Sequence, residues 1–131
     1  MKFRVEGKPV PQGSMKVING HVLHAQGSAL IYWRSAIAIE CKKVIPVPLT
    51  GAVEVRMAFE LEKPKSVNRT YPAKYPDLDK LIRAVLDGIT GSGVVDDGQV
   101  INIVASKRYG RPSVTVEIIP AEEMDDSKKI F

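Results

Sequence analysis

The sequence predicts an α+β fold, a single domain in which two helices pack on a small mixed β-sheet. Short runs with the alternating apolar and polar residues of a half-buried strand surround two longer runs with helical period. Gly, Pro and Asn-Gly punctuate the boundaries between these runs. The 131 residues are the length of one ordinary domain, expected to span 1–131. A chain of this length buries enough surface to fold without a disulfide or a structural metal.

The first half of the chain predicts a strand, a hairpin, a helix and a second strand. Residues 3–6 alternate apolar and polar side chains, and a Pro-rich loop follows them. Asn19-Gly20 separates two β-prone runs and predicts a hairpin, because both turn positions require a positive φ. Ser28 is placed to cap a helix that ends before Pro46. Residues 52–61 alternate well and predict the next strand.

The second half predicts a helix over residues 77–90, after a proline-containing loop at 62–76. Its apolar residues form one stripe at helical spacing: Leu78, Leu81, Ile82, Val85, Leu86 and Ile89. Strands are expected at 100–106 and 113–119. The acidic tail, 120–131, is expected to be flexible.

Composition excludes several classes of protein. A single cysteine, Cys41, excludes an intramolecular disulfide and a cysteine-based zinc site. No apolar run is long enough to cross a membrane. The N-terminus carries charges where a signal peptide needs its apolar stretch. We therefore expect a soluble, cytoplasmic protein.

The charge is unevenly distributed along the chain. Residues 1–111 contain 17 basic and 10 acidic side chains, a net charge of +7, whereas residues 112–131 have a net charge of −3. A basic body suits a polyanionic partner such as nucleic acid. Many proteins are mildly basic for no such reason, so charge alone does not decide the partner.

Two pairs of carboxylates flank the second predicted helix. Asp77 and Asp79 stand at its start, and Asp96-Asp97 follow its end. Each pair has an ordinary structural explanation, since Asp favours helix N-termini and turns. If the two pairs converge, their mutual repulsion requires a cation, and oxygen ligands select Mg²⁺ or Mn²⁺. Such a site suits phosphodiester hydrolysis. The spacing leaves both interpretations open.

The loop before this helix is basic and contains aromatic residues. Between residues 63 and 76 it has four basic side chains, two tyrosines and no acid. Basic side chains bind phosphates, and tyrosines stack on unpaired bases. The alternative is a solvated loop whose tyrosines pack on prolines. The candidate DNA-binding residues of this loop and its surroundings are Lys63, Lys65, Arg69, Lys74, Lys80, Lys107 and Arg108.

These motifs together resemble the RusA family of Holliday junction resolvases. The segment beginning at Pro76 reads Pro-Asp-Leu-Asp-Lys-Leu, residues 96–100 read Asp-Asp-Gly-Gln-Val, and Lys107 follows. Family members typically read Pro-Asp-Leu-Asp-Asn-Leu, then Asp-Asp-x-Gln-Val/Ile, with a Lys about ten residues on. Residues 7–14 also resemble phage-borne members. The resemblance covers residues 3–119.

The resemblance implies a small homodimeric endonuclease that depends on Mg²⁺, with Mn²⁺ as a substitute, and that nicks four-way DNA junctions symmetrically. No small-molecule cofactor is implied. By position, Asp77, Asp79 and Asp97 match the family's metal-binding carboxylates, and Asp96 matches the neighbouring acid.

The sequence departs from the family pattern at two positions. Lys80 replaces an Asn and places a cation beside the acids, and Arg83 replaces a functional Lys. Arginine keeps the positive charge but does not release a proton under ordinary conditions. We therefore expect Arg83 and Lys107 to contact the scissile phosphate. The rival functions are a less selective debranching nuclease and a non-catalytic protein that binds branched DNA.

Overall fold

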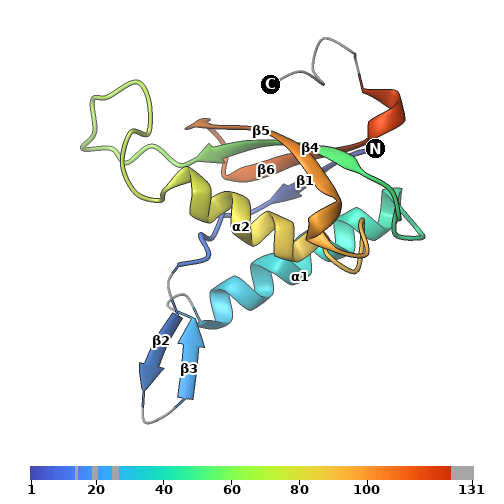
Figure 1. Ribbon diagram of the computed structural model, residues 1–131. Helices are drawn as coiled ribbons and strands as arrows, with labels where there is room; N and C mark the ends of the chain where they lie inside the picture. The colour runs from blue at the N-terminus through green and yellow to red at the C-terminus, as the bar shows by residue number, and fades with distance from the viewer. Residues whose placement is uncertain (14, 19–20, 25–26, 125–131) are drawn as a thin grey trace.

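The computed structural model describes residues 1–13, 15–18, 21–24 and 27–124. It is an α+β fold in which two helices and a four-stranded sheet form the body, and a hairpin extends from it (Figure 1). The elements are, in chain order, β1 (Lys2–Glu6), β2 (Met15–Ile18), β3 (His21–His24), α1 (Gly27–Val44), β4 (Val53–Leu61), α2 (Leu78–Ile89), η1 (Asp97–Gln99), β5 (Val100–Tyr109), β6 (Ser113–Pro120) and η2 (Ala121–Glu123).

The main sheet is mixed, as the sequence predicts, with strand order β1-β6-β4-β5. β6 pairs antiparallel with both β1 and β4, whereas β4 and β5 are parallel. Parallel neighbours need a crossover connection, and α2 lies within the segment that joins β4 to β5. This connection places the start of α2 near the end of β5.

The core lies between the helices and one face of the sheet. Along β4, Val55, Met57 and Phe59 are buried in a cluster with residues from both helices. Figure 1 shows α1 and α2 on the same side of the sheet. The predicted stripe of α2 is confirmed, since Leu81 and Val85 are fully buried and the stripe's other members are buried or pack on the core.

The two helices cross closely at Gly88. A Cβ atom at this position would lie 2.9 Å from the Cβ and Cγ2 atoms of Ile37, closer than real side-chain contacts allow. We expect Gly88→Ala to lower the free energy of unfolding by about 1–2 kcal/mol, because overpacking outweighs the gain in helix propensity. Urea denaturation measures this effect. Gly51→Ala is the control, because nothing lies within 4 Å of its added Cβ. Equal stability of the two variants would contradict the close crossing.

The structure corrects two details of the sequence prediction. α1 begins at Gly27, so Ser28 lies within its first turn instead of capping it. Residues 121–124 were expected to belong to a flexible tail, but they form η2 and the buried Met124. The apolar Met124 side chain offsets the cost of ordering this turn. Residues 125–131 lie outside the described part of the chain.

Two further predictions concern the hairpin and membranes. β2 and β3 pair antiparallel with Ile18 opposite His21, as expected for a hairpin. Its Asn19-Gly20 turn lies outside the described residues. Neither described helix combines the length and the apolarity needed to cross a membrane.

Candidate functional site

The first turn of α2 presents two exposed carboxylates. Asp77 occupies the N-cap position, where its backbone carbonyl accepts hydrogen bonds from the N–H groups of Lys80 and Leu81. Its side chain makes no capping hydrogen bond. An Asp at this position usually caps the helix with its side chain, and the Asp77 carboxylate does not do so. Asp79 lies two residues on and is also exposed.

Lys80 engages one of these carboxylates. Its Nζ donates a hydrogen bond of 2.8 Å to Oδ2 of Asp79. This hydrogen bond lowers the pKa of the Asp79 carboxyl, and the charge of the ammonium acts in the same direction. The Asp79 side chain is therefore a carboxylate at neutral pH, the form that ligates a cation.

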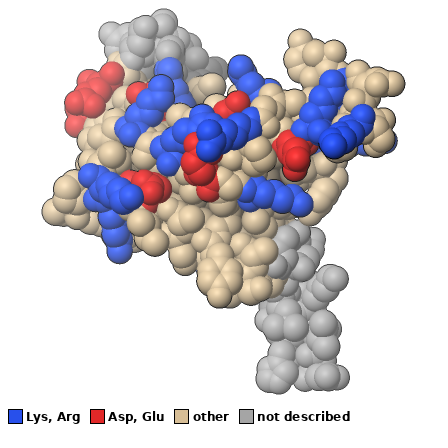
Figure 2. Space-filling model, turned by 180° about the vertical axis from the view of Figure 1, so that it is seen from behind, with Lys and Arg blue, Asp and Glu red and all other residues tan. Residues whose placement is uncertain are grey.

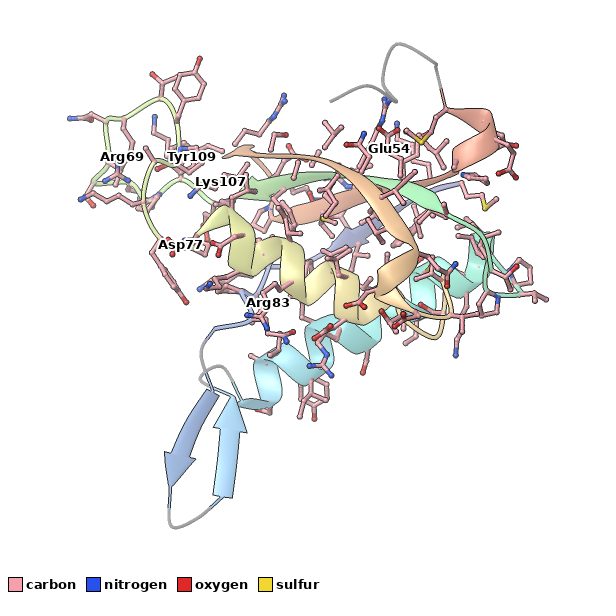
Figure 3. All side chains as sticks on the ribbon, viewed as in Figure 1. Glu54, Arg69, Asp77, Arg83, Lys107 and Tyr109 are labelled. Atoms are coloured by element: carbon pink, nitrogen blue, oxygen red, sulfur yellow. The ribbon has the colours of Figure 1, made fainter. Side chains whose placement is uncertain are left out.

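Lys107 ties the end of β5 to the segment before α2. Its Nζ donates to the backbone carbonyls of Lys74 at 2.7 Å and Pro76 at 2.9 Å. An ammonium has three donors, so one remains for another acceptor. Figure 3 shows Lys107 beside Asp77 at the same end of the molecule. The predicted phosphate-binding lysine thus also positions the residue that precedes Asp77.

A second set of contacts joins the basic loop to β5. Arg69 Nη1 donates a hydrogen bond of 3.0 Å to the hydroxyl of Tyr109, and Lys63 Nζ lies 5.8 Å from the centroid of the Tyr109 ring. The loop residues Lys63, Arg69 and Lys74 therefore lie around the end of β5. The other four candidate DNA-binding residues belong to the same loop, to the start of α2 or to the end of β5: Lys65, Lys80, Lys107 and Arg108.

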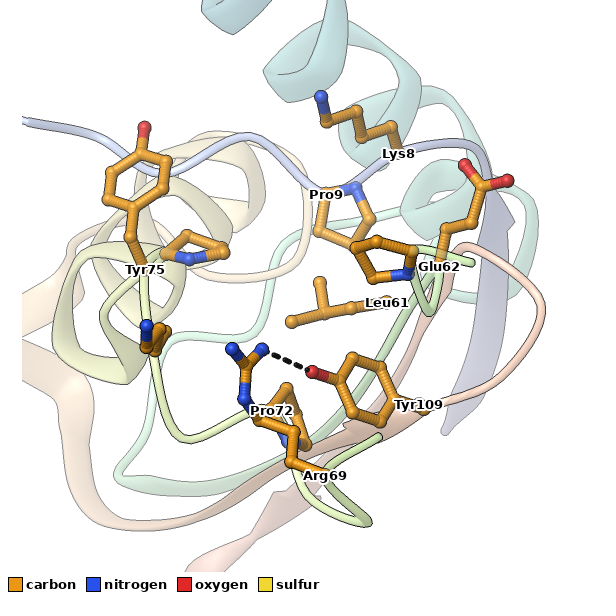
Figure 4. A pocket seen from close by; sticks show the side chains of 11 residues that line it. Lys8, Pro9, Leu61, Glu62, Arg69, Pro72, Tyr75 and Tyr109 are labelled. Carbon is orange, nitrogen blue, oxygen red and sulfur yellow. Dashed lines mark hydrogen bonds between the residues drawn. The ribbon is translucent and has the colours of Figure 1, made fainter. Parts of the chain in front are cut away.

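Beside Asp77 lies a cavity of about 480 Å³ (Figure 4). Its apolar wall comes from prolines, Leu61 and the rings of Tyr75 and Tyr109, and its basic members are Lys8, Arg69 and Lys74. Neither Lys8 nor Tyr109 was among the residues predicted to bind DNA or metal. No local pattern marks them, because the cavity forms where three distant segments meet.

The second pair of carboxylates is held at the far end of β5 by Gln99. The Gln99 Oε1 accepts hydrogen bonds from the backbone N–H groups of Val95 and Asp96, both at 2.9 Å. Its Nε2 donates to the carbonyls of Leu49 and Gly51, both at 2.8 Å. Asp96 and Asp97 are thereby exposed on a fixed turn at the start of β5.

The described chain does not bring the two carboxylate pairs together. Lys107 contacts the residue before Asp77, and Asp97 precedes Val100 at the opposite end of the strand. The seven steps from Val100 to Lys107 span about 23 Å at 3.3 Å per residue. Accordingly, no group of three or more His, Cys, Asp or Glu side chains able to hold a metal ion occurs among the described residues. One chain offers two ligand pairs at separate places.

Arg83 lies on the exposed surface of α2. It is four residues beyond Asp79, so the two side chains share one face of the helix. Figure 3 shows Arg83 on α2. On the same helix Asp87 faces Arg34 of α1 at 4.0 Å, a contact between the two helices.

The rear face of the molecule carries charges of both signs (Figure 2). Figure 2 shows Lys and Arg side chains interspersed with Asp and Glu on the face seen from behind. The buried Glu54 accepts hydrogen bonds from Arg56 and Asn102, and the second of these joins β4 to β5. It lies apart from Asp77 (Figure 3).

Comparison with known proteins identifies the family. The chain matches the endodeoxyribonuclease RusA family over residues 6–119, which is most of its length. This protein belongs to the RusA family. It is also 28% identical to YqaN of Bacillus subtilis (strain 168), an uncharacterized protein. The match covers 90% of this chain and 94% of YqaN.

The RusA match includes every residue of the candidate site. Both carboxylate pairs, the basic loop and the end of β5 lie within residues 6–119. The family is one of DNA endonucleases.

Proposed function

We propose that this RusA-family protein is a Mg²⁺-dependent endonuclease that resolves four-way DNA junctions by paired, symmetric nicks. The observation that carries the proposal is that all seven candidate DNA-binding residues belong to the basic loop, the start of α2 or the end of β5, which Lys107 and Tyr109 join to one another. Asp77 and Asp79 are exposed at the same place. Carboxylates surrounded by phosphate-binding cations are the arrangement that metal-assisted phosphodiester hydrolysis needs.

The carboxylates fit a hard cation. Asp77 and Asp79 offer oxygen ligands, and neither is buried in a competing structural role. Asp97 is the third proposed ligand, with Asp96 beside it; because one chain holds this pair at the opposite end of β5, it would have to reach the cation from a second copy of the protein. Bound Mg²⁺, or Mn²⁺ in its place, would polarise the phosphoryl oxygen and lower the pKa of a water molecule.

The basic residues bind and orient the phosphodiester. Lys107 is fixed by two carbonyl groups, and its third donor remains for a phosphate oxygen. Arg83 shares a helix face with Asp79 and keeps its proton, so its role is electrostatic. Lys80 competes with the cation for Asp79 through its hydrogen bond.

The cavity beside Asp77 favours a branched substrate. Its tyrosine and proline walls can stack on a base, and its basic members can bind the flanking phosphates. A continuous duplex offers few unstacked bases, whereas a branch point offers them readily. This observation also suits the second candidate, a debranching nuclease.

The test compares three DNA substrates of matched sequence: a four-way junction, a fork and a linear duplex. We expect cleavage of the junction in Mg²⁺, none in EDTA, and little cleavage of the linear duplex. Equal cleavage of fork and junction would favour the debranching nuclease. Junction binding without cleavage in Mg²⁺ or Mn²⁺ would instead assign the protein a non-catalytic role.

A further inference from the structure

The cavity at the start of α2 combines an apolar interior with positive charge. Its volume of about 480 Å³ lies in the range of pockets that hold a small molecule. Pro9, Leu61 and Pro72 line it and are buried. Three of its lining residues are basic and one, Glu62, is acidic. Such a cavity suits a ligand that joins a flat apolar ring to negative charge, and a nucleotide is a ligand of this kind.

The ring of Tyr109 is held in place at one side of this cavity. Arg69 Nη1 donates a hydrogen bond of 3.0 Å to its hydroxyl, and Lys63 Nζ lies 5.8 Å from the centroid of the ring. Figure 4 shows the rings of Tyr109 and Tyr75 on different sides of Leu61. A ring that is fixed before the ligand arrives loses little conformational entropy when a base stacks on it.

The cavity adjoins the proposed metal ligands. Pro76 lines it and directly precedes Asp77. Lys107 donates a hydrogen bond of 2.9 Å to the carbonyl of Pro76 and fixes this junction between loop and helix. A DNA strand with a phosphate at Asp77 therefore has neighbouring nucleotides beside the cavity.

We propose that the cavity takes one unpaired base from the branch point of a DNA junction, and that Tyr109 stacks on this base. Lys8, Arg69 and Lys74 bind the phosphates beside it. A base in a continuous duplex must first be unpaired and unstacked, and this cost is least where a branch already exposes the base. The choice of DNA as the ligand rests on the proposed function, whereas the binding of the base does not depend on cleavage.

The test is a thermodynamic cycle between Tyr109 and a single base. Fluorescence anisotropy in EDTA compares an intact four-way junction with junctions that carry one abasic nucleotide, placed at each branch-point position in turn. At one position, loss of the base should lower the affinity of the wild type about tenfold, the scale of one stacking contact. The same loss should leave the affinity of Tyr109→Leu almost unchanged, because the stacking partner is already gone. Tyr109→Phe keeps the ring and should respond like the wild type.

Tyr32→Leu is the control, because Tyr32 is an exposed tyrosine of α1 that does not line the cavity. It should respond to the abasic nucleotide like the wild type. If Tyr109 served only the packing of β5, Tyr109→Leu would weaken the binding of intact and abasic junctions by the same factor. That result, or equal wild-type affinity for the intact junction and every abasic junction, would overturn the base pocket.

A second measurement uses the wild-type protein alone, so it does not depend on the folding of a variant. Junctions carry 5-iododeoxyuridine either at the branch point or in the middle of an arm, and photo-cross-links are mapped by mass spectrometry. We expect the branch-point nucleotide to cross-link to Tyr109 or Tyr75 and the arm nucleotide to cross-link to neither. Branch-point cross-links that map only outside the cavity would overturn the inference.

Both measurements are made in EDTA, which separates the inference from the proposed function. If Tyr109 and the base are coupled but the wild type cuts no DNA in Mg²⁺ or Mn²⁺, the proposed nuclease function fails and the base pocket stands. If the wild type cuts the junction and no position shows the coupling, the base pocket is wrong and the nuclease function stands.

Discussion

Asp97→Asn is expected to lower single-turnover cleavage of a four-way junction by at least about a hundredfold, the scale on which lost electrostatic stabilisation of a transition state is felt. The substitution keeps the size of the side chain but removes the charge of a proposed metal ligand. Junction affinity without metal should stay equal or rise, because a negative charge near the phosphates is removed. Folding should be unharmed, since Asp97 is exposed on its turn.

The experiment measures cleavage, junction affinity and melting temperature on one preparation. Glu122→Gln in η2 is the matched control, because it also neutralises an exposed acid but lies outside the candidate site. The control should cleave like the wild type. If Asp97 acts only in its turn, the substitution would instead cost about 1 kcal/mol of stability and leave cleavage intact. Wild-type cleavage by Asp97→Asn would therefore remove this residue from the metal site.

Junction affinity is expected to fall about a thousandfold between 50 and 200 mM salt, without any requirement for the metal. The net charge of +7 over residues 1–111 and the basic side chains around α2 support about six phosphate contacts, and each contact releases counterions. Fluorescence anisotropy in EDTA over a series of salt concentrations measures the slope.

Single substitutions give this slope a residue-level test. Lys65→Gln removes an exposed loop cation and should reduce the salt slope by about one. Lys43→Gln removes a cation from α1 that pairs with Glu40 at 2.9 Å, and it should leave the slope unchanged. A flat salt response, or equal effects of the two substitutions, would contradict a DNA interface on the loop.

The local parts of the fold could be predicted from the sequence because local periodicity determines them. The stripe of α2, the alternation of β4 and the hairpin each depend on neighbours in the chain. The candidate DNA-binding residues could be proposed from the basic, tyrosine-containing loop, whereas their arrangement in the fold could not. The structure adds that they surround one end of the sheet.

What could not be predicted depends on contacts between distant segments. The distance between Asp77 and Asp97 is set by the path of β5 alongside β4, which no local pattern encodes. The cavity at Tyr109 likewise needs Lys8, the loop and β5 to meet. In sequence, β5 resembles a half-buried strand. Only the strand order shows that it forms an edge of the sheet.

The most direct test of the account is to map the nicks on a four-way junction labelled in each strand in turn. The account predicts nicks in two strands of like polarity, at symmetric positions, with Mg²⁺ present and none in EDTA. Loss of these nicks in Asp77→Asn, with junction binding retained, would tie them to the start of α2. A protein that binds the junction but leaves all four strands intact with Mg²⁺ or Mn²⁺ would contradict the central claim.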